Sequence, residues 1–319
     1  MDAFLADISA AQIWFTNQDV IRGAKPLEIV PSYPAADVSV SELPRRELSL
    51  LDIKAPYHLA VPKQERRRSS QCIICHSITD PPPNTFVRLS KHVYAIGPIP
   101  ALIALANRIP LGHSMLLINQ ILGKYQILNG SVVERRPMAT IRSIEAYLNS
   151  LYHVRGSARV RRLLKYAIEN TASPEEARLA ALLLLPENLG GKGLPAATSN
   201  ERLRTTDACF ASPRYPDLFW KKYRLVLEYE SDEFHSGRDS LGKDSARRAQ
   251  LQAAGYHVVT MTNRQLHNPV EFEDTVRALK RYMGLELKTP DEPVSSFSEK
   301  ERELRDALYR FNLKAALGI

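Results

Sequence analysis

The sequence predicts an α/β protein in which an α+β N-terminal domain precedes a C-terminal core of mixed β-sheet and flanking helices. Two observations lead to this prediction. Short apolar strand candidates alternate with segments of helical periodicity along most of the chain, and prolines and glycines mark many of the boundaries between them. A chain of 319 residues is long enough for two domains.

The N-terminal half combines both kinds of element. A short helix is expected from ADISAAQIWF, and strands are expected at YHLAVP, QCIICHSI and FVRLSKHVYAIG. PIPALIALANRI and PLGHSMLLINQILGKY indicate two helices, each with a proline near its first turn. We therefore expect an α+β domain with a winged-helix-like start over residues 1–138, followed by a helical connector over 139–172.

A new unit is predicted to begin at Ser173. In SPEEARLAALLLL this serine can cap a helix, with proline at the first helical position and a glutamate three residues after the cap. A hairpin, a helix ending at Gly255, the strand YHVVTM and a helix ending at Gly284 are expected to follow. We place this domain at 173–285, and a Pro/Ser-rich linker with a final amphipathic helix at 286–319.

Composition limits the function classes. The formal net charge of +8 favours polyanionic partners such as nucleic acid. The absence of an apolar run of 18 residues argues against a membrane span. The N-terminal MDAFLADISAAQIWF has acids where a signal peptide would have lysine or arginine, so we expect a cytoplasmic protein.

Two of the three cysteines, Cys72 and Cys75, lie in the run CIICH. The spacing is that of c-type haem attachment, and with His76 and a distant ligand it could also form part of a zinc site. The simplest interpretation is a strand in which cysteine behaves as a small hydrophobic residue.

The most informative stretch is RYPDLFWKKYRLVLEYESDEFH at 214–235. Side chains of a strand alternate between faces, so Glu228 and Glu230 share one face, about 7 Å apart at ~3.3 Å per residue. A hairpin through the polar turn WKKYR would bring Asp217 beside them. Three carboxylates on one half-buried face repel one another, and a Mg²⁺ or Mn²⁺ ion with oxygen ligands would remove that cost.

The same residues resemble a known family. Pro-Asp, a short turn, an apolar strand and E-x-E look like the PD-(D/E)XK nuclease motif, and LEYESDEFH with KDSARRAQLQAAGYHVVTMT resembles the branch related to very-short-patch repair endonucleases. The segment SPEEARLAALLLLPENLGGKGLP is similar to the one that precedes this domain in bacterial abortive-infection antitoxin (AbiEi-like) proteins. The resemblance implies a restriction-endonuclease-like core.

Residue by residue, the resemblance implies Asp217 and Glu228 as metal ligands. Glu230, which could also bind metal, stands where the superfamily has lysine and this branch usually has aspartate. Two further catalytic residues are implied, Glu176 on the first helix and His235 after the strand. The lysine's positive charge would have to come from Lys222, Lys243 or His235. The expected contacts to nucleic acid are basic side chains around the hairpin and on the next helix: Lys222, Lys243, Arg247 and Arg248.

Several of these residues have simpler interpretations. Glu176 can serve only to complete a helix cap, His235 can be a surface turn residue, and Asp244 with Arg247 can form an ordinary i,i+3 ion pair.

The expected function is Mg²⁺-dependent hydrolysis of DNA by an endonuclease-like bacterial protein of the toxin–antitoxin or phage-defence type. Two alternatives stay open. One is a non-catalytic DNA-binding regulator or antitoxin with a degenerate nuclease fold, and the other is a partner of a toxin or defence protein with no nucleic-acid role.

Overall fold

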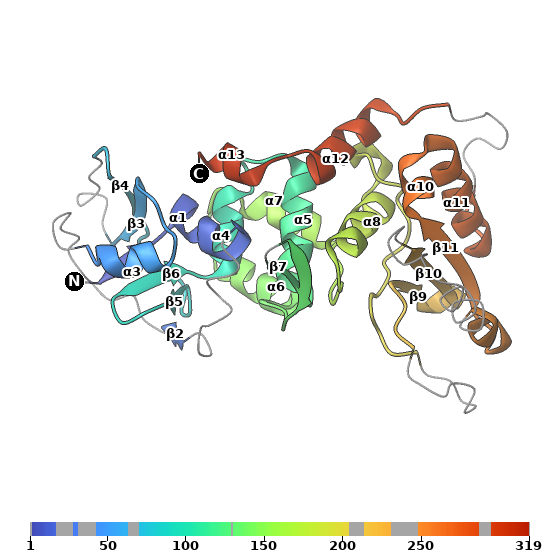
Figure 1. Cartoon of the computed structure of the whole chain (residues 1–319), viewed down its shortest axis with the longest axis horizontal. Coiled ribbons are helices and arrows are strands. Elements are labelled where there is room, and N and C mark those ends of the chain that lie inside the picture. The colour runs from blue at the N-terminus through green and yellow to red at the C-terminus, as the bar shows by residue number, and fades with distance from the viewer. Residues whose placement is uncertain are drawn as a thin grey trace. The chain divides into compact units, whose positions relative to one another are not determined.

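The computed structural model divides the chain into two compact units. The first comprises 1–121, 126–165 and 311–319, and the second comprises 122–125 and 166–310. Figure 1 shows the elements of both. The structure describes residues 2–16, 28–30, 43–62, 70–128, 130–203, 214–230, 248–286 and 295–318.

The first unit contains a six-stranded mixed sheet. Its strand order is β2-β5-β6-β1-β3-β4. The pairs β1–β6 and β3–β4 are parallel, and the pairs β1–β3, β2–β5 and β5–β6 are antiparallel. The strands are β1 (Ala3–Leu5), β2 (Glu28–Val30), β3 (Tyr57–Val61), β4 (Ile73–Ser77), β5 (Phe86–Arg88) and β6 (Val93–Ile96).

Helices and a hairpin complete this part of the chain. α1 continues directly into the π-helix η1, where buried Trp14 donates its indole N–H to the carbonyl of Ile96 at 2.7 Å. That bond ties η1 to the end of β6 and satisfies the one polar group of a core tryptophan. The elements are α1 (Asp7–Ala11), η1 (Gln12–Thr16), α3 (Arg45–Leu50), α4 (Pro98–Leu105), α5 (Leu111–Leu122), β7 (Tyr125–Leu128), β8 (Ser131–Glu134), α6 (Ile141–Asn149), α7 (Ser157–Leu164) and α13 (Leu313–Leu317).

The second unit is built around a three-stranded mixed sheet of order β11-β10-β9. β9 and β10 are antiparallel, whereas β10 and β11 are parallel. The elements are α8 (Pro174–Leu184), η4 (Glu187–Leu189), β9 (Leu218–Trp220), the 3₁₀ turn η5 (Lys221–Tyr223), β10 (Leu225–Glu230), β11 (His257–Thr262), α10 (Asn263–His267), α11 (Pro269–Tyr282) and α12 (Glu299–Tyr309). Residues 248–253 are also helical.

Local capping explains where several helices of this unit begin. Ser173 caps α8 by accepting a hydrogen bond from the backbone N–H of Glu176. Ser298 and Glu301 form a reciprocal capping box at α12. Asn268 accepts from two backbone N–H groups at the start of α11. Each cap satisfies N–H groups that the first helical turn leaves without a partner.

The predicted α/β class with mixed sheets and several helices is confirmed at this level. The structure groups the helices of 139–165 with the first unit, and it divides the C-terminal segment, with α12 in the second unit and α13 in the first. None of the helices in the described ranges is both long and apolar enough to cross a membrane.

Candidate functional site

The β9–β10 hairpin brings Asp217 and Glu228 together. Leu225 pairs with Trp220 and Leu227 with Leu218. The same antiparallel register, continued by one residue, sets Asp217 opposite Glu228. Directly opposed residues point to the same face of a sheet, so the hairpin gathers these two carboxylates at one end of the sheet, with Glu230 two residues further along β10.

Asp217 has a backbone partner on the neighbouring strand. Its Oδ2 accepts a hydrogen bond from the N–H of Tyr229 at 2.6 Å, and the side chain is half-buried. A carboxylate that accepts from backbone N–H is stabilised in its charged form. The bond also connects the two strands' chain segments at the open end of the hairpin, since Asp217 comes just before the first residue of β9.

A cation lies beside Glu230. The Nη2 of Arg248 is 3.3 Å from Glu230 Oε1 and donates to Thr260 Oγ1 at 2.8 Å. In the parallel pairing of β10 with β11, Thr260 is the residue next to Glu228. The guanidinium therefore lies over the same face of the sheet as the acids. We call the set Asp217, Glu228, Glu230, Arg248 and Thr260 the acidic face.

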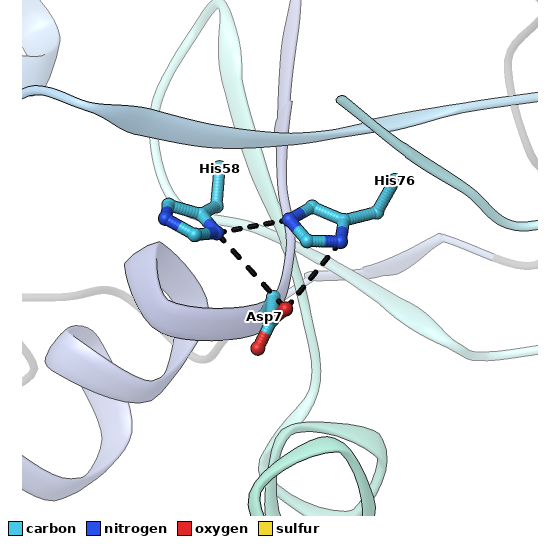
Figure 2. Close-up of side chains that lie close together, drawn as sticks. All are labelled: Asp7, His58 and His76. Carbon is cyan, nitrogen blue, oxygen red and sulfur yellow. Dashed lines mark hydrogen bonds and ion pairs between the residues drawn. The ribbon is translucent and has the colours of Figure 1, made fainter. Parts of the chain in front are cut away.

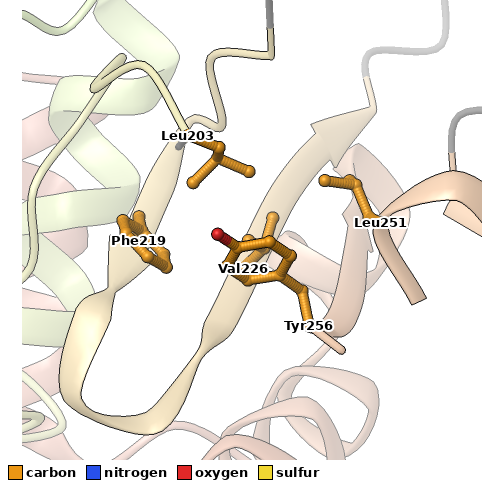
Figure 3. Close-up of a cluster of buried hydrophobic side chains, with 5 residues drawn as sticks. All are labelled: Leu203, Phe219, Val226, Leu251 and Tyr256. Carbon is orange, nitrogen blue, oxygen red and sulfur yellow. The ribbon is translucent and has the colours of Figure 1, made fainter. Parts of the chain in front are cut away.

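Apolar packing explains how Arg248 reaches this place. Figure 3 shows the buried cluster of Leu203, Phe219, Val226, Leu251 and Tyr256, with Leu251 brought in by the helix at 248–253. Val226 is on the face that carries Glu228 and Glu230. Residues three apart in a helix are neighbours on its surface, so the helix that buries Leu251 on the sheet also directs Arg248 to the acids.

Glu176 is a buried capping residue with three donors. Its Oε2 accepts from the N–H of Ala172 at 2.8 Å and from Nδ2 of Asn200 at 2.7 Å, and its Oε1 accepts from the hydroxyl of Ser173 at 2.9 Å. Burial raises the pKa of the Glu176 carboxyl above its usual value, although these hydrogen bonds act in the opposite direction. The capping role that the sequence left open for this residue is present in the structure.

Asn200 connects Glu176 to the hairpin. Its backbone N–H donates to the carbonyl of Pro216 at 2.8 Å, one residue before Asp217. Two residues earlier, Thr198 forms an antiparallel bridge with Phe219. Asn200 thus joins the buried acid of α8, through its side chain, to the segment that carries the first acid of the acidic face, through its backbone.

The other sequence candidates are placed differently. Lys222 lies exposed in the η5 turn, at the end of the hairpin away from Asp217, with its Nζ 5.1 Å from the centroid of the Tyr223 ring. His235, Lys243 and Arg247 lie outside the described residues, as does Asp244. The structure thus places Arg248 with the acids, but not Lys222.

A second polar cluster lies in the first unit and was not predicted. Among the described residues, Asp7, His58 and His76 form the one group of at least three Asp, Glu, His or Cys side chains with ligand atoms all within 4.8 Å of one another. Asp217, Glu228 and Glu230 do not form such a group in the described chain. Figure 2 shows the two imidazoles above the carboxylate at the start of α1.

Sheet register and helix position bring these three residues together. His76 pairs with Ala60 in the parallel β3–β4 ladder, so His58 is its diagonal neighbour on the same face. Asp7 follows β1, the strand on the other side of β3. Its φ of 45° lies in the left-handed region, which aspartate adopts more readily than most residues.

The distances between side-chain atoms show that the three residues form one connected cluster. His58 Nδ1 is 2.9 Å from His76 Nε2, and Asp7 Oδ2 is 3.4 Å from His76 Nδ1 and 4.0 Å from His58 Nδ1. Arg108 Nη1 donates to the other oxygen of Asp7 at 2.6 Å. Burial, followed by the neighbouring His76, lowers the pKa of the His58 imidazole. Two imidazoles and a carboxylate of this kind could hold a metal ion.

The cluster opens onto a cavity within the first unit. Asp7 and His76 line a pocket of about 520 Å³ together with Asp80, Thr85, Ile103 and Tyr147. Tyr147 and Thr85 share a hydrogen bond at 3.0 Å, and burial raises the pKa of the Tyr147 phenol. A pocket of this size can take a small molecule.

The strand interpretation of CIICH is confirmed for Cys75 but not for Cys72. β4 covers Ile73–Ser77 with Cys75 buried, whereas Cys72 lies just before the strand and is exposed. His76 points to the opposite face from Cys75. The sequence signal that could have indicated the cluster was therefore the presence of one histidine in each of two strands, His58 and His76. The cysteine spacing did not indicate it.

Comparisons with known proteins give few indications of function. The chain is 31% identical over 141 residues to uncharacterized proteins of two Mycobacterium tuberculosis strains, CDC 1551 / Oshkosh and H37Rv. The match covers 39% of this chain and 48% of each relative, so the chain spans about half the length of the curated relatives it matches. The chain matches no family model and no solved structure at a significant level.

Proposed function

We propose that the second unit is a restriction-endonuclease-like core that hydrolyses DNA phosphodiesters with a divalent metal ion held by Asp217, Glu228 and Glu230. The observation that supports this most strongly is the hairpin register, which sets Asp217 opposite Glu228. A PD-(D/E)XK motif requires this convergence of an acid before one strand with an acid inside the next.

The donor set suits Mg²⁺ or Mn²⁺. Both ions prefer carboxylate oxygens and keep water or substrate phosphate in their remaining positions. When bound, such an ion supplies an activated water and offsets the charge that develops on the phosphate. The half-buried carboxylates of Asp217 and Glu228 would hold it, and the Tyr229 N–H fixes the orientation of Asp217.

In this proposal Arg248 supplies the positive charge that the superfamily's lysine provides. Glu230 occupies the lysine position, and Arg248 compensates it from the helix that packs on the same face. A guanidinium stays protonated at all relevant pH values. Arg248 can therefore orient phosphate oxygens and stabilise negative charge, but it does not act as a base.

One observation favours a second candidate, a DNA-binding regulator or antitoxin without turnover. Protein groups already contact the acids, since Asp217 accepts the Tyr229 N–H and Glu230 pairs with Arg248. In a nuclease-like site that has lost its activity, contacts of this kind with protein groups would stabilise the acids in place of a metal ion. Such a protein would bind DNA, or a toxin or defence partner protein, through surfaces that do not need the metal.

A cleavage assay separates the two candidates. Supercoiled plasmid and single-stranded DNA are incubated with the full chain and Mg²⁺ or Mn²⁺, alongside Glu228→Gln and the matched variant Glu271→Gln. Glu271 is an acid of the same unit that pairs with Arg264 at 3.2 Å, and it is not part of the acidic face. Metal-dependent cleavage that is lost only in Glu228→Gln supports the nuclease. DNA binding that weakens with salt, without cleavage by the wild type, favours the regulator.

A further inference from the structure

We propose that the first unit holds a divalent transition-metal ion of the zinc type through His58 Nδ1, His76 Nε2 and one carboxylate oxygen of Asp7, with an open coordination position toward the neighbouring pocket. This site is separate from the acidic face of the second unit and does not depend on its proposed function.

The spacing of the donor atoms suits such an ion. Metal–nitrogen bonds of about 2.05 Å place two ligand nitrogens about 2.9 Å apart at a right angle, and about 3.3 Å apart in a tetrahedron. His58 Nδ1 and His76 Nε2 are 2.9 Å apart. Asp7 Oδ2 lies 4.0 Å from His58 Nδ1 but faces the other nitrogen of the second ring, His76 Nδ1, at 3.4 Å. The His76 ring or the carboxylate therefore has to turn for all three donors to reach one ion.

The chemistry of the donors favours zinc over magnesium. Imidazole nitrogens suit zinc, copper, iron and nickel, whereas magnesium takes oxygen ligands. Asp7 and His58 are buried, and the His76 side chain is 23% exposed. Thus the set has one edge open to solvent. Two histidines and a carboxylate with an open position are typical of catalytic rather than structural zinc sites.

Groups around the cluster hold the ligands in place. Arg108 binds Asp7 Oδ1 and leaves Oδ2 directed at the histidines. The hydroxyl of Ser9 accepts from the backbone N–H of His58 at 3.0 Å. Such contacts fix the orientation of metal ligands, and their loss commonly costs about 10- to 100-fold in metal affinity.

The position of the pocket implies where a metal-bound ligand would lie. Asp7 and His76 line the cavity, whose other lining groups include the hydroxyls of Thr85 and Tyr147. Those two side chains are hydrogen-bonded to each other. A small ligand in the cavity would bind the ion through an oxygen or nitrogen donor and could also form hydrogen bonds with these hydroxyl groups.

A proton can account for the same distances without metal. With a hydrogen on His58 Nδ1 and another on His76 Nδ1, the chain His58–His76–Asp7 would be a pair of hydrogen bonds between neutral rings and the carboxylate. The two arrangements differ in metal uptake, which makes the proposal directly testable.

The test is Zn²⁺ binding to the full chain in excess Mg²⁺, which occupies oxygen-only sites. We expect one Zn²⁺ per wild-type chain and a higher melting temperature on binding. His58→Gln and His76→Gln should each weaken binding at least about 100-fold, because losing a ligand costs more than losing a supporting contact. The matched control is His92→Gln, since His92 pairs with Asp2 at 2.9 Å in the same unit without a second histidine.

Two results overturn the proposal. One is the absence of Zn²⁺ uptake by the folded wild type, and the other is unchanged uptake in both histidine variants, which would place the ion elsewhere, for example on cysteines. If both variants fail to fold, X-ray absorption of the wild type loaded with Zn²⁺ decides instead. Two imidazole nitrogens per ion support the site, whereas a shell containing sulfur or only oxygen contradicts it.

Discussion

Arg248 and Glu230 form an ion pair with a 3.3 Å Nη2–Oε1 distance, and the same nitrogen donates to Thr260 on the next strand. The arginine comes from a helix whose Leu251 is buried against the sheet. Apolar packing therefore positions a cation over a face that carries three acids. The pair is partly exposed, at 45% for Arg248 and 27% for Glu230, so its direct contribution to stability is small, about 0–1 kcal/mol.

Arg248→Gln tests whether this cation serves function rather than folding. We expect stability to change by less than about 1 kcal/mol and DNA cleavage to fall at least about 100-fold, the scale typical for loss of a group that stabilises developing charge. The control is Arg264→Gln, which removes an exposed ion pair with Glu271 in the same unit. Equal activity of both variants would remove Arg248 from the mechanism.

Asp217 has two separable roles in this account, because it accepts a backbone hydrogen bond and carries a charge. Asp217→Asn keeps an acceptor oxygen for the Tyr229 N–H, so stability should stay close to wild type while Mn²⁺ affinity falls. Asp217→Ala leaves that N–H without its partner and should cost about 1–3 kcal/mol as well. Denaturant unfolding and Mn²⁺ titration of the two variants give both quantities. Equal Mn²⁺ affinity in Asp217→Asn and wild type would exclude the carboxylate as a ligand.

Adjacent residues of β10 should behave in opposite ways. Glu228→Gln removes repulsion from the acidic face, so the melting temperature without metal should hold or rise, while cleavage disappears. Leu227 is fully buried on the other face, and Leu227→Ala should cost about 2–5 kcal/mol but leave the chemistry of the folded fraction intact. A large drop in melting temperature for Glu228→Gln would mean that the charge of this acid stabilises the fold through an ion pair.

The raised pKa of Glu176 predicts a pH dependence of stability. The folded protein holds this proton more tightly than the unfolded chain, whose carboxyl titrates near 4.5. Its stabilising effect is full below that pH and is lost as the pH rises through the folded-state pKa. Glu176→Gln keeps the neutral form at every pH, and its amide can accept from Ala172 and Asn200 through oxygen while donating to the Ser173 hydroxyl through nitrogen. The variant should therefore gain stability relative to wild type between acidic and neutral pH, as measured by denaturant unfolding. A constant difference across that range would contradict the assignment.

Local sequence signals predicted much of the fold. The serine cap of α8 and the glycines after the helices mark real ends, and the apolar runs on either side of WKKYR form the predicted hairpin. These features depend on neighbours in the chain, so their pattern is visible without a structure. The alternation along β10 also predicted which acids share a face.

The other features of the two sites depend on contacts between residues that are distant in the sequence. Asp7, His58 and His76 come from three segments that meet only because β1, β3 and β4 are adjacent in the sheet. Strand order is not encoded in local periodicity. The sequence predicts Arg248 as a nucleic-acid contact, but its pairing with Glu230 depends on the packing of Leu251. The same limitation applies to Asn200, whose link to Glu176 spans 24 residues.

The most direct test of the central claim is a double-mutant cycle for Mn²⁺ binding at Asp217 and Glu228. It is measured by calorimetry in a His76→Gln background, which removes the candidate site of the first unit. If both acids hold one ion, the reference protein should take up one Mn²⁺, each of Asp217→Asn and Glu228→Gln should abolish most of the affinity, and the double variant should lose little more than either. No uptake by the folded reference protein at millimolar Mn²⁺, or affinity unchanged by both substitutions, would contradict a metal site on the acidic face.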